Sequence, residues 1–180
     1  MQTAPRTAVL AYPEIQDADR AWIESVRRVE DPQFDTVRPH FTLAFPSQVA
    51  APGAVLHASS VARAFSPIDF VLDATRAVPD RVHGGCHVFL VPSAGAPEIE
   101  ALHRALYDGP FGPHRLPGVP FIPHLTVGAH PAETDSQALI ARLEGKVPEI
   151  RGRILEIDVV EAWPRETPSV RTIPLSSVSS

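Results

Sequence analysis

Apolar residues along this chain recur with two periods, one typical of strands and one typical of helices. Alternating or continuous apolar runs predict strands over residues 7–12, 40–45, 68–78, 87–91, 124–127, 151–162 and 170–175. Apolar side chains three or four positions apart predict helices over residues 13–28, 54–65, 97–108 and 132–143. Glycine and proline dominate residues 109–120, which we expect to form a loop. Because strands and helices are interspersed, the expected fold class is α+β.

One five-residue pattern occurs twice in this order of elements. Residues 39–43 read Pro-His-Phe-Thr-Leu and residues 123–127 read Pro-His-Leu-Thr-Val, 84 positions later. The chain's own numbers of proline, histidine and threonine predict far fewer than one such match by chance. Side chains alternate along a strand, so His40 and Thr42 share one face, as do His124 and Thr126. Each strand can therefore bury an apolar face and present an imidazole together with a hydroxyl.

Two such strands could carry out a displacement at phosphorus. The reaction needs one proton removed from the nucleophile and one delivered to the leaving oxygen, and histidine can do either near neutral pH. A threonine hydroxyl could donate to a non-bridging phosphate oxygen. Two other interpretations are buried structural histidines and a metal site, although the sequence places no third metal ligand beside either motif.

The two motifs resemble those of the two-histidine (2H) phosphoesterase superfamily, which includes the RNA 2',3'-cyclic phosphodiesterases named 2'-5' RNA ligases. The resemblance implies a bilobal fold with pseudo-twofold symmetry, in which two antiparallel sheets flank a central cleft and helices pack outside. It also implies hydrolysis of 2',3'-cyclic phosphates of nucleotides or RNA ends to 2'-phosphates, without metal or cofactor. By the same analogy His40 is the general acid and His124 the general base. The alternatives are 2'-5' RNA ligation through the same histidines and a nucleotide-binding module without turnover.

Five further residues are candidates for substrate binding. Arg38 has the strand parity of His40 and could pair with phosphate, and Arg115 lies in the loop before the second motif. Tyr12 and Phe121 could stack on a base, although core packing would explain either ring equally well. His130 could line the mouth of the site, but a surface histidine is the commoner case.

A second histidine-rich segment, residues 83–87, reads His-Gly-Gly-Cys-His. It places three potential metal ligands close together but lacks the fourth that a structural zinc site needs, so we expect no metal there.

The composition limits the kinds of partner that this protein could bind. A net charge of -5 argues against an extended, sequence-independent nucleic-acid surface, so the nucleotide or RNA-end substrate should be held locally. A single cysteine excludes an intramolecular disulfide, and no stretch is apolar enough to span a membrane. We therefore expect a cytoplasmic monomer that folds as one domain of two similar lobes over residues 1–180, with a frayed tail over 176–180.

Overall fold

The structure, a computed structural model, describes residues 5–176 as an α+β fold. Its helices are α1 (Asp17–Glu30), α2 (Ala51–Ala62), α3 (Ala96–Tyr107) and α4 (Glu133–Leu143), with a short 3-10 turn at Gly112–His114. Its strands are β1 (Arg6–Ala11), β2 (Glu14–Ile15), β3 (Phe41–Ser47), β4 (Ile68–Pro79), β5 (Cys86–Ala94), β6 (Leu125–His130), β7 (Ile150–Ile154), β8 (Glu156–Ala162) and β9 (Ser169–Pro174). The predicted fold class is confirmed.

The strands form two antiparallel sheets. The first sheet has the order β3-β1-β8-β9, and the second sheet has the order β2-β7-β4-β5-β6. Strand β3, which follows His40, is an edge of the first sheet, and β6, which follows His124, is an edge of the second. The two copies of the motif therefore occupy equivalent edge positions in two different sheets.

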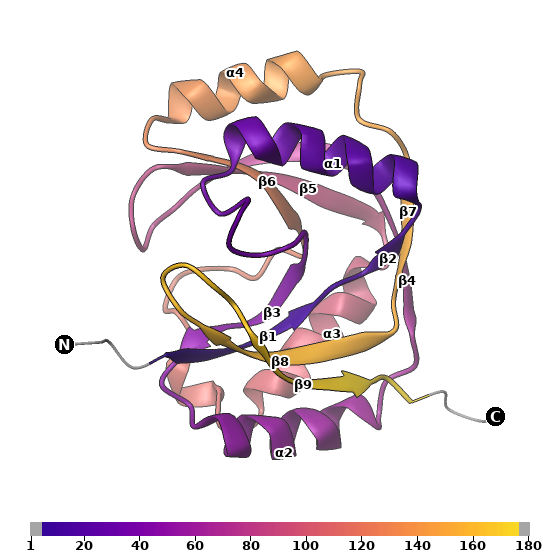
Figure 1. Ribbon diagram of the computed structural model, residues 1–180, viewed down its shortest axis with the longest axis vertical. Coiled ribbons are helices and arrows are strands. Elements are labelled where there is room, and N and C mark those ends of the chain that lie inside the picture. Colours follow the sequence, from indigo (N-terminus) through magenta and orange to yellow (C-terminus); the bar gives the residue numbers. More distant parts are fainter. Residues whose placement is uncertain (1–4, 177–180) are drawn as a thin grey trace.

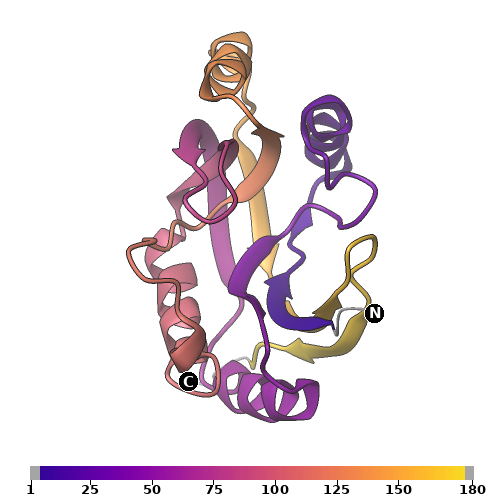
Figure 2. The ribbon, with the colours of Figure 1, turned by 90° about the vertical axis from the view of Figure 1, so that its left-hand side faces the viewer.

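Helices cover the outer faces of both sheets. Helix α1 packs against β6, and α4 packs against β4, β5 and β6; α2 packs against β1, β8 and β9, and α3 against β3 and β4. Figures 1 and 2 accordingly show α1 and α4 at one end of the molecule and α2 at the opposite end. None of the helices in residues 5–176 combines the length and the apolar character that crossing a membrane requires.

The larger of two hydrophobic clusters contains residues of both sheets and connects them. Phe41 and Leu43 of β3 are fully buried, as are Leu125 and Val127 of β6, so the apolar half of each motif points into this core. The rings of Phe41 and Phe70 meet edge to face with centroids 5.1 Å apart, which joins β3 of the first sheet to β4 of the second. The strand alternation predicted from the sequence is therefore the alternation that the fold uses.

Several element boundaries differ from the predicted ones. The single strand predicted over residues 151–162 is two strands, because the chain leaves the second sheet after β7 and enters the first sheet at β8. Helix α1 begins four residues later than predicted, because Glu14 and Ile15 first pair with β7 as strand β2. Helix α2 begins three residues earlier, at Ala51, with Pro52 in its first turn. The predicted frayed tail lies outside the described residues apart from Ser176, whose N–H donates to the Ala62 carbonyl.

Candidate active site

His40 and His124 are held in the same way. The Nδ1 atom of His40 lies 2.7 Å from the Arg38 carbonyl oxygen, and Nδ1 of His124 lies 2.5 Å from the Ile122 carbonyl oxygen. A carbonyl oxygen only accepts hydrogen bonds, so Nδ1 carries the proton in each ring and Nε2 of the neutral ring is an acceptor. Each imidazole therefore offers a free Nε2 to the site, where it can take up or release a proton.

The sequence around each histidine explains this shared geometry. A buried proline, Pro39 or Pro123, stands between the carbonyl and the histidine that bonds to it. Proline fixes its own φ near -65° and keeps the preceding residue extended, which restricts where that residue's carbonyl can point. The sequence predicted strands that begin with these two histidines. In the structure β3 begins at Phe41 and β6 at Leu125, so each histidine immediately precedes its strand.

The threonines follow the expected alternation. Thr42 and Thr126 are half-buried, while the apolar residues on either side of each are buried. Among the described residues, neither threonine hydroxyl has a hydrogen-bond partner, so both are available to a ligand. Each edge strand thus brings one imidazole and one hydroxyl to the same side.

Burial lowers the pKa of His40 and of His124 to about 4. The hydrogen bond to the Arg38 carbonyl and the charge of Asp31 act in the opposite direction on the pKa of His40, whereas the charge of Arg27 lowers it further. For His124, the charges of His40 and His87 add to the effect of burial. The influence of His40 on His124 requires the two rings to lie within electrostatic range of each other. Both rings are therefore neutral at pH 7 in the free protein.

Two of the predicted residues, Tyr12 and Arg38, lie beside the first histidine. The ring of Tyr12 meets the ring of His40 edge-on at 6.0 Å, and the Arg38 guanidinium lies 4.2 Å above the centre of the Tyr12 ring. Burial raises the pKa of Tyr12, although the nearby Arg38 charge opposes the rise. Tyr12 therefore keeps its phenolic proton, and both its ring and the exposed Arg38 side chain border the site.

A buried arginine on α1 holds the loop that leads to His40. Arg27 is 1% exposed; its Nε donates to Asp31 at 2.9 Å, and its NH2 group donates to the Val37 carbonyl at 2.7 Å. The Asp31 carboxylate in turn accepts the Gln33 N–H at 2.9 Å. Because Val37 is followed directly by Arg38, Pro39 and His40, this network fixes the approach of the chain to the first motif.

Helix α3 connects the first motif to the loop before the second. The buried His103 donates from Nδ1 to the Leu43 carbonyl of β3 at 2.8 Å, and its ring stacks on Phe121 at 3.7 Å. One helical turn later, the Tyr107 hydroxyl accepts the Phe45 N–H at 3.1 Å. Both bonds satisfy backbone groups on the open edge of β3. Phe121, predicted as a base-stacking residue, thus packs against α3.

The two remaining candidates lie elsewhere. The Arg115 guanidinium is 4.8 Å above the ring of Tyr107, on the loop side of α3. His130 lies at the far end of β6, six residues and about 20 Å along the strand from His124. Both its ring nitrogens are engaged, by Glu30 at 2.8 Å and Ser136 at 3.0 Å. The structure does not bring His130 to the histidine pair.

Comparison with known proteins agrees with this arrangement. The family model described as the 2'-5' RNA ligase superfamily matches residues 15–162. The chain belongs to the 2'-5' RNA ligase superfamily. The family resemblance inferred from the two motifs is thereby confirmed. No curated protein matches the chain in sequence.

Solved structures of similar proteins show the same fold. The Thermus thermophilus protein TT0787 has a TM-score of 0.67 at 18% identity, covering 97% of this chain and 100% of the other. E. coli LigT, crystallised with 3'-AMP, has a TM-score of 0.56 at 18% identity and the same coverage. Kluyveromyces marxianus Usb1 has a TM-score of 0.59 at 11% identity, covering 96% of this chain and 99% of the other. The fold of these structures thus extends over nearly the whole chain.

One residue beside the site was missed from the sequence. The ring of Phe89, on β5, stacks on the ring of His124 with centroids 3.5 Å apart and planes inclined by 14°. Phe89 is also the cross-strand partner of Thr126. In this member of the superfamily the second histidine therefore has an aromatic neighbour. Only the register between β5 and β6 reveals it, and nothing in residues 87–91 alone predicts that register.

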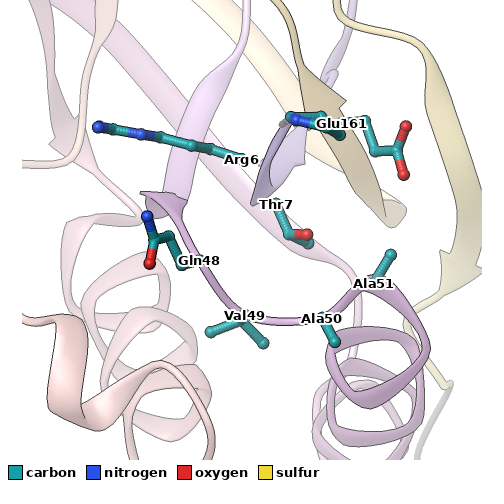
Figure 3. Close-up of a pocket in the computed structure, with 8 residues that line it drawn as sticks. Arg6, Thr7, Gln48, Val49, Ala50, Ala51 and Glu161 are labelled. Atoms are coloured by element: carbon teal, nitrogen blue, oxygen red, sulfur yellow. The ribbon is translucent and has the colours of Figure 1, made fainter. Parts of the chain in front are cut away.

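The pocket drawn in Figure 3 is separate from the histidines. It has a volume of about 590 Å³ and is lined by Pro5, Arg6, Thr7, Gln48, Val49, Ala50, Ala51 and Glu161. Thr7 pairs with Ser47 at one end of β1, whereas Ala11, at the other end, pairs with Phe41 beside His40.

Within residues 5–176, no three His, Cys, Asp or Glu side chains are placed to hold a metal ion, and this includes residues 83–87.

Proposed function

We propose that this protein is a phosphodiesterase that hydrolyses 2',3'-cyclic phosphates of nucleotides or RNA ends to 2'-phosphates, with its two histidines as acid and base. The observation that supports it most directly is the duplicated histidine geometry, in which each Nδ1 is bonded to a carbonyl and each Nε2 is free. Two proton-transferring groups of this kind are what an in-line displacement at phosphorus requires. Membership of the 2'-5' RNA ligase superfamily is consistent with this chemistry.

In the proposed reaction, a water oxygen attacks the phosphorus while its proton passes to Nε2 of a neutral histidine. The bond between phosphorus and O3' breaks, and the second histidine, as imidazolium, delivers its Nε2 proton to O3'. The product is a 2'-phosphate with a free 3'-hydroxyl, and the two histidines have exchanged protonation states. A bound phosphate anion favours the imidazolium form, so one ring can be charged in the complex although both are neutral in the free protein.

By the family analogy His40 is assigned as acid and His124 as base, and the charges around the rings are compatible with this order. Beside His40 the charge of Arg27 lowers the pKa and the Asp31 carboxylate raises it, so the two oppose each other, whereas the charges of His40 and His87 both lower the pKa of His124. In this order, a phosphate between the rings would place its proton on His40. His124 would stay neutral and accept the proton of water.

Thr42 and Thr126 would donate to the two non-bridging oxygens, where negative charge grows during the attack. Arg38 and Tyr12, which already contact each other, would hold the rest of the nucleotide beside His40 through the guanidinium charge and the ring face.

The test is release of 2'-phosphate from each 2',3'-cyclic nucleotide and from a short RNA with a cyclic end, with EDTA present throughout. We expect turnover with a bell-shaped pH profile in the wild type, and a loss of at least about 100-fold in His40→Ala and in His124→Ala. His114→Ala, which removes an exposed histidine of the loop, is the matched control and should retain full activity. Wild-type turnover in either active-site variant, or dependence on added metal, would contradict the proposal.

Two further outcomes separate the alternatives. Binding of a 2'-phosphate product without any turnover would identify a binding module. Joining of a 2',3'-cyclic end to a 5'-hydroxyl end would indicate ligation, which uses the same two proton transfers with the 5'-hydroxyl in place of water. Comparing mononucleotide with oligonucleotide substrates then measures how far the substrate extends beyond the phosphate.

A further inference from the structure

The turn between β4 and β5 contains a carboxylate that the proposed reaction does not use. Oδ1 of Asp80 accepts the N–H groups of Val82 at 2.8 Å and His83 at 3.0 Å, which fixes the carboxylate within its own turn. Oδ2 lies 3.2 Å from Nε2 of His87 and 3.3 Å from Nδ1 of His83. Desolvation alone would raise the pKa of Asp80, but the hydrogen bonds from His83, Val82 and His87 lower it to about 2. Asp80 is therefore an anion that holds His87.

From His87, three rings stack in a row that ends at the active site. His87 and Phe89 are two positions apart in β5, so their side chains lie on the same face of the second sheet. Their ring centroids are 5.8 Å apart and their planes are inclined by 16°. The Phe89 ring in turn stacks on His124, with centroids 3.5 Å apart and planes inclined by 14°. Phe89 is only 8% exposed, so the middle ring has little freedom to move. The orientation of His124 thus depends on a column that begins at Asp80.

Packing alone does not account for a histidine at position 87. Its Nδ1 is buried and has no hydrogen-bond partner among the described residues. A buried polar nitrogen left without a partner costs free energy that a phenylalanine in the same stack would avoid. What the imidazole provides, and phenylalanine would not, is the bond to Asp80 and the capacity to carry a positive charge.

The charges around His87 are few. Asp80 and His83 approach it from the turn, while its cross-strand partners, Val78 on β4 and Ala129 on β6, are uncharged. Arg76 of β4 lies two pairs further on, opposite Phe89. A positive charge on His87 also lowers the pKa of His124, so His87 and His124 are coupled by charge as well as through the stacked rings.

We propose that His87, held by Asp80, is a positioning residue that acts on His124 through the ring of Phe89, fixing the imidazole plane and favouring its neutral, proton-accepting form. The inference rests on the proposed function, because a base that must remain neutral is useful only if His124 accepts a proton. It assigns a role to His87, the last residue of the His-Gly-Gly-Cys-His segment, which acts on His124 from the neighbouring strand β5.

The test compares four variants of the full-length protein. His87→Phe keeps a stacked ring but removes the charge and the bond to Asp80, whereas His87→Ala removes all three. Asp80→Asn keeps a polar partner but no anion. His83→Ala is the matched control, since His83 contacts the same carboxylate but is exposed and lies outside the column. Each is measured by kcat, KM and the pH profile, and by an NMR titration of the His124 ring.

In His87→Phe we expect the pKa of His124 to rise and the acid limb of the kcat/KM profile to move to higher pH by the same amount, with KM unchanged. In His87→Ala we expect in addition a fall in kcat of roughly 10- to 100-fold, because the Phe89 ring loses its support. In Asp80→Asn, kcat should fall less than in His87→Ala, and His83→Ala should match the wild type. An unchanged His124 titration in both His87 variants, or an equal change in His83→Ala, would overturn the inference. The NMR titration needs no substrate, so it decides the matter even if the wild type shows no turnover and the proposed function fails.

Discussion

Lowering the pH from 7 to 4 should destabilise this protein through the two motif histidines, His40 and His124. Burial lowers the pKa of both His40 and His124 from 6.5 to about 4 in the folded protein, whereas in the unfolded chain both keep the ordinary value. Between these values the unfolded state binds protons that the folded state does not. The free energy of unfolding therefore falls as the pH falls from about 6.5 to about 4, and the loss is complete below that range.

The size of the effect follows from the two shifts. One pKa unit corresponds to about 1.4 kcal/mol, so each histidine could contribute about 3 kcal/mol. Because both rings are only half-buried, solvent screens part of the interaction, and we expect about 2 kcal/mol for each and about 4 kcal/mol for the pair. This is a large part of the stability of a typical domain.

The assay is urea unfolding at a series of pH values for the wild type and for the double variant His40→Asn/His124→Asn. Asparagine does not titrate, so the double variant should lose about 4 kcal/mol less than the wild type between pH 7 and pH 4. Titration of carboxylates elsewhere is common to both proteins and cancels in the difference. His114→Asn is the matched control and should follow the wild type.

Inorganic phosphate offers a second check on the same reasoning. An anion that binds between the rings favours their charged form, so roughly 50 mM phosphate should reduce the acid-induced loss in the wild type and leave the double variant unaffected. If the double variant lost as much stability as the wild type between pH 7 and pH 4, the two rings would not be desolvated as the structure indicates, and the reasoning would be refuted.

Substitutions at three further positions test residues that form the site or hold it in place. Arg27→Met should lower the free energy of unfolding by about 3–5 kcal/mol, because it leaves a buried carboxylate unpaired, while Arg28→Met on the exposed side of α1 should cost under about 1 kcal/mol; urea unfolding measures both. His103→Phe keeps the stack on Phe121 but leaves a carbonyl of β3 unpaired, and should cost about 1–3 kcal/mol in the same measurement. Thr126→Val should lower kcat on a cyclic phosphate by about 10- to 100-fold without changing the unfolding midpoint, and Thr126→Ser should restore most of the rate.

The sequence predicts the geometry of the two motifs better than it predicts what surrounds them. Thr42 and Thr126 could be placed on their strands, and His40 and His124 within one residue of the strand starts, because alternation and a repeated proline are local properties of the chain. Phe89 could not be found, because its place beside His124 depends on how β5 pairs with β6. For the same reason the division of residues 150–162 between two sheets was missed, since both halves have ordinary strand patterns.

Arg27 and His103 show a different limit. Both lie on helices whose periodicity was recognised, yet a charged or polar residue in such a pattern is predicted to face solvent. Here each is buried because its polar atoms bond to backbone carbonyls beside the active site, Val37 for one and Leu43 for the other. A polar residue buried among apolar ones on a helix face is recognisable only once the carbonyl that it bonds is known.

The two halves of the site share a local geometry and differ in their neighbours, and the difference is what a reaction with an acid and a base requires. Identical motifs give both histidines the same tautomer, so the motifs alone cannot tell the rings apart. The distinction must come from the elements packed behind them: a carboxylate on the α1 side of His40, and the Phe89 ring with His87 beyond it on the β5 side of His124. Removing Asp31 should therefore lower the pKa of His40, and removing His87 should raise the pKa of His124.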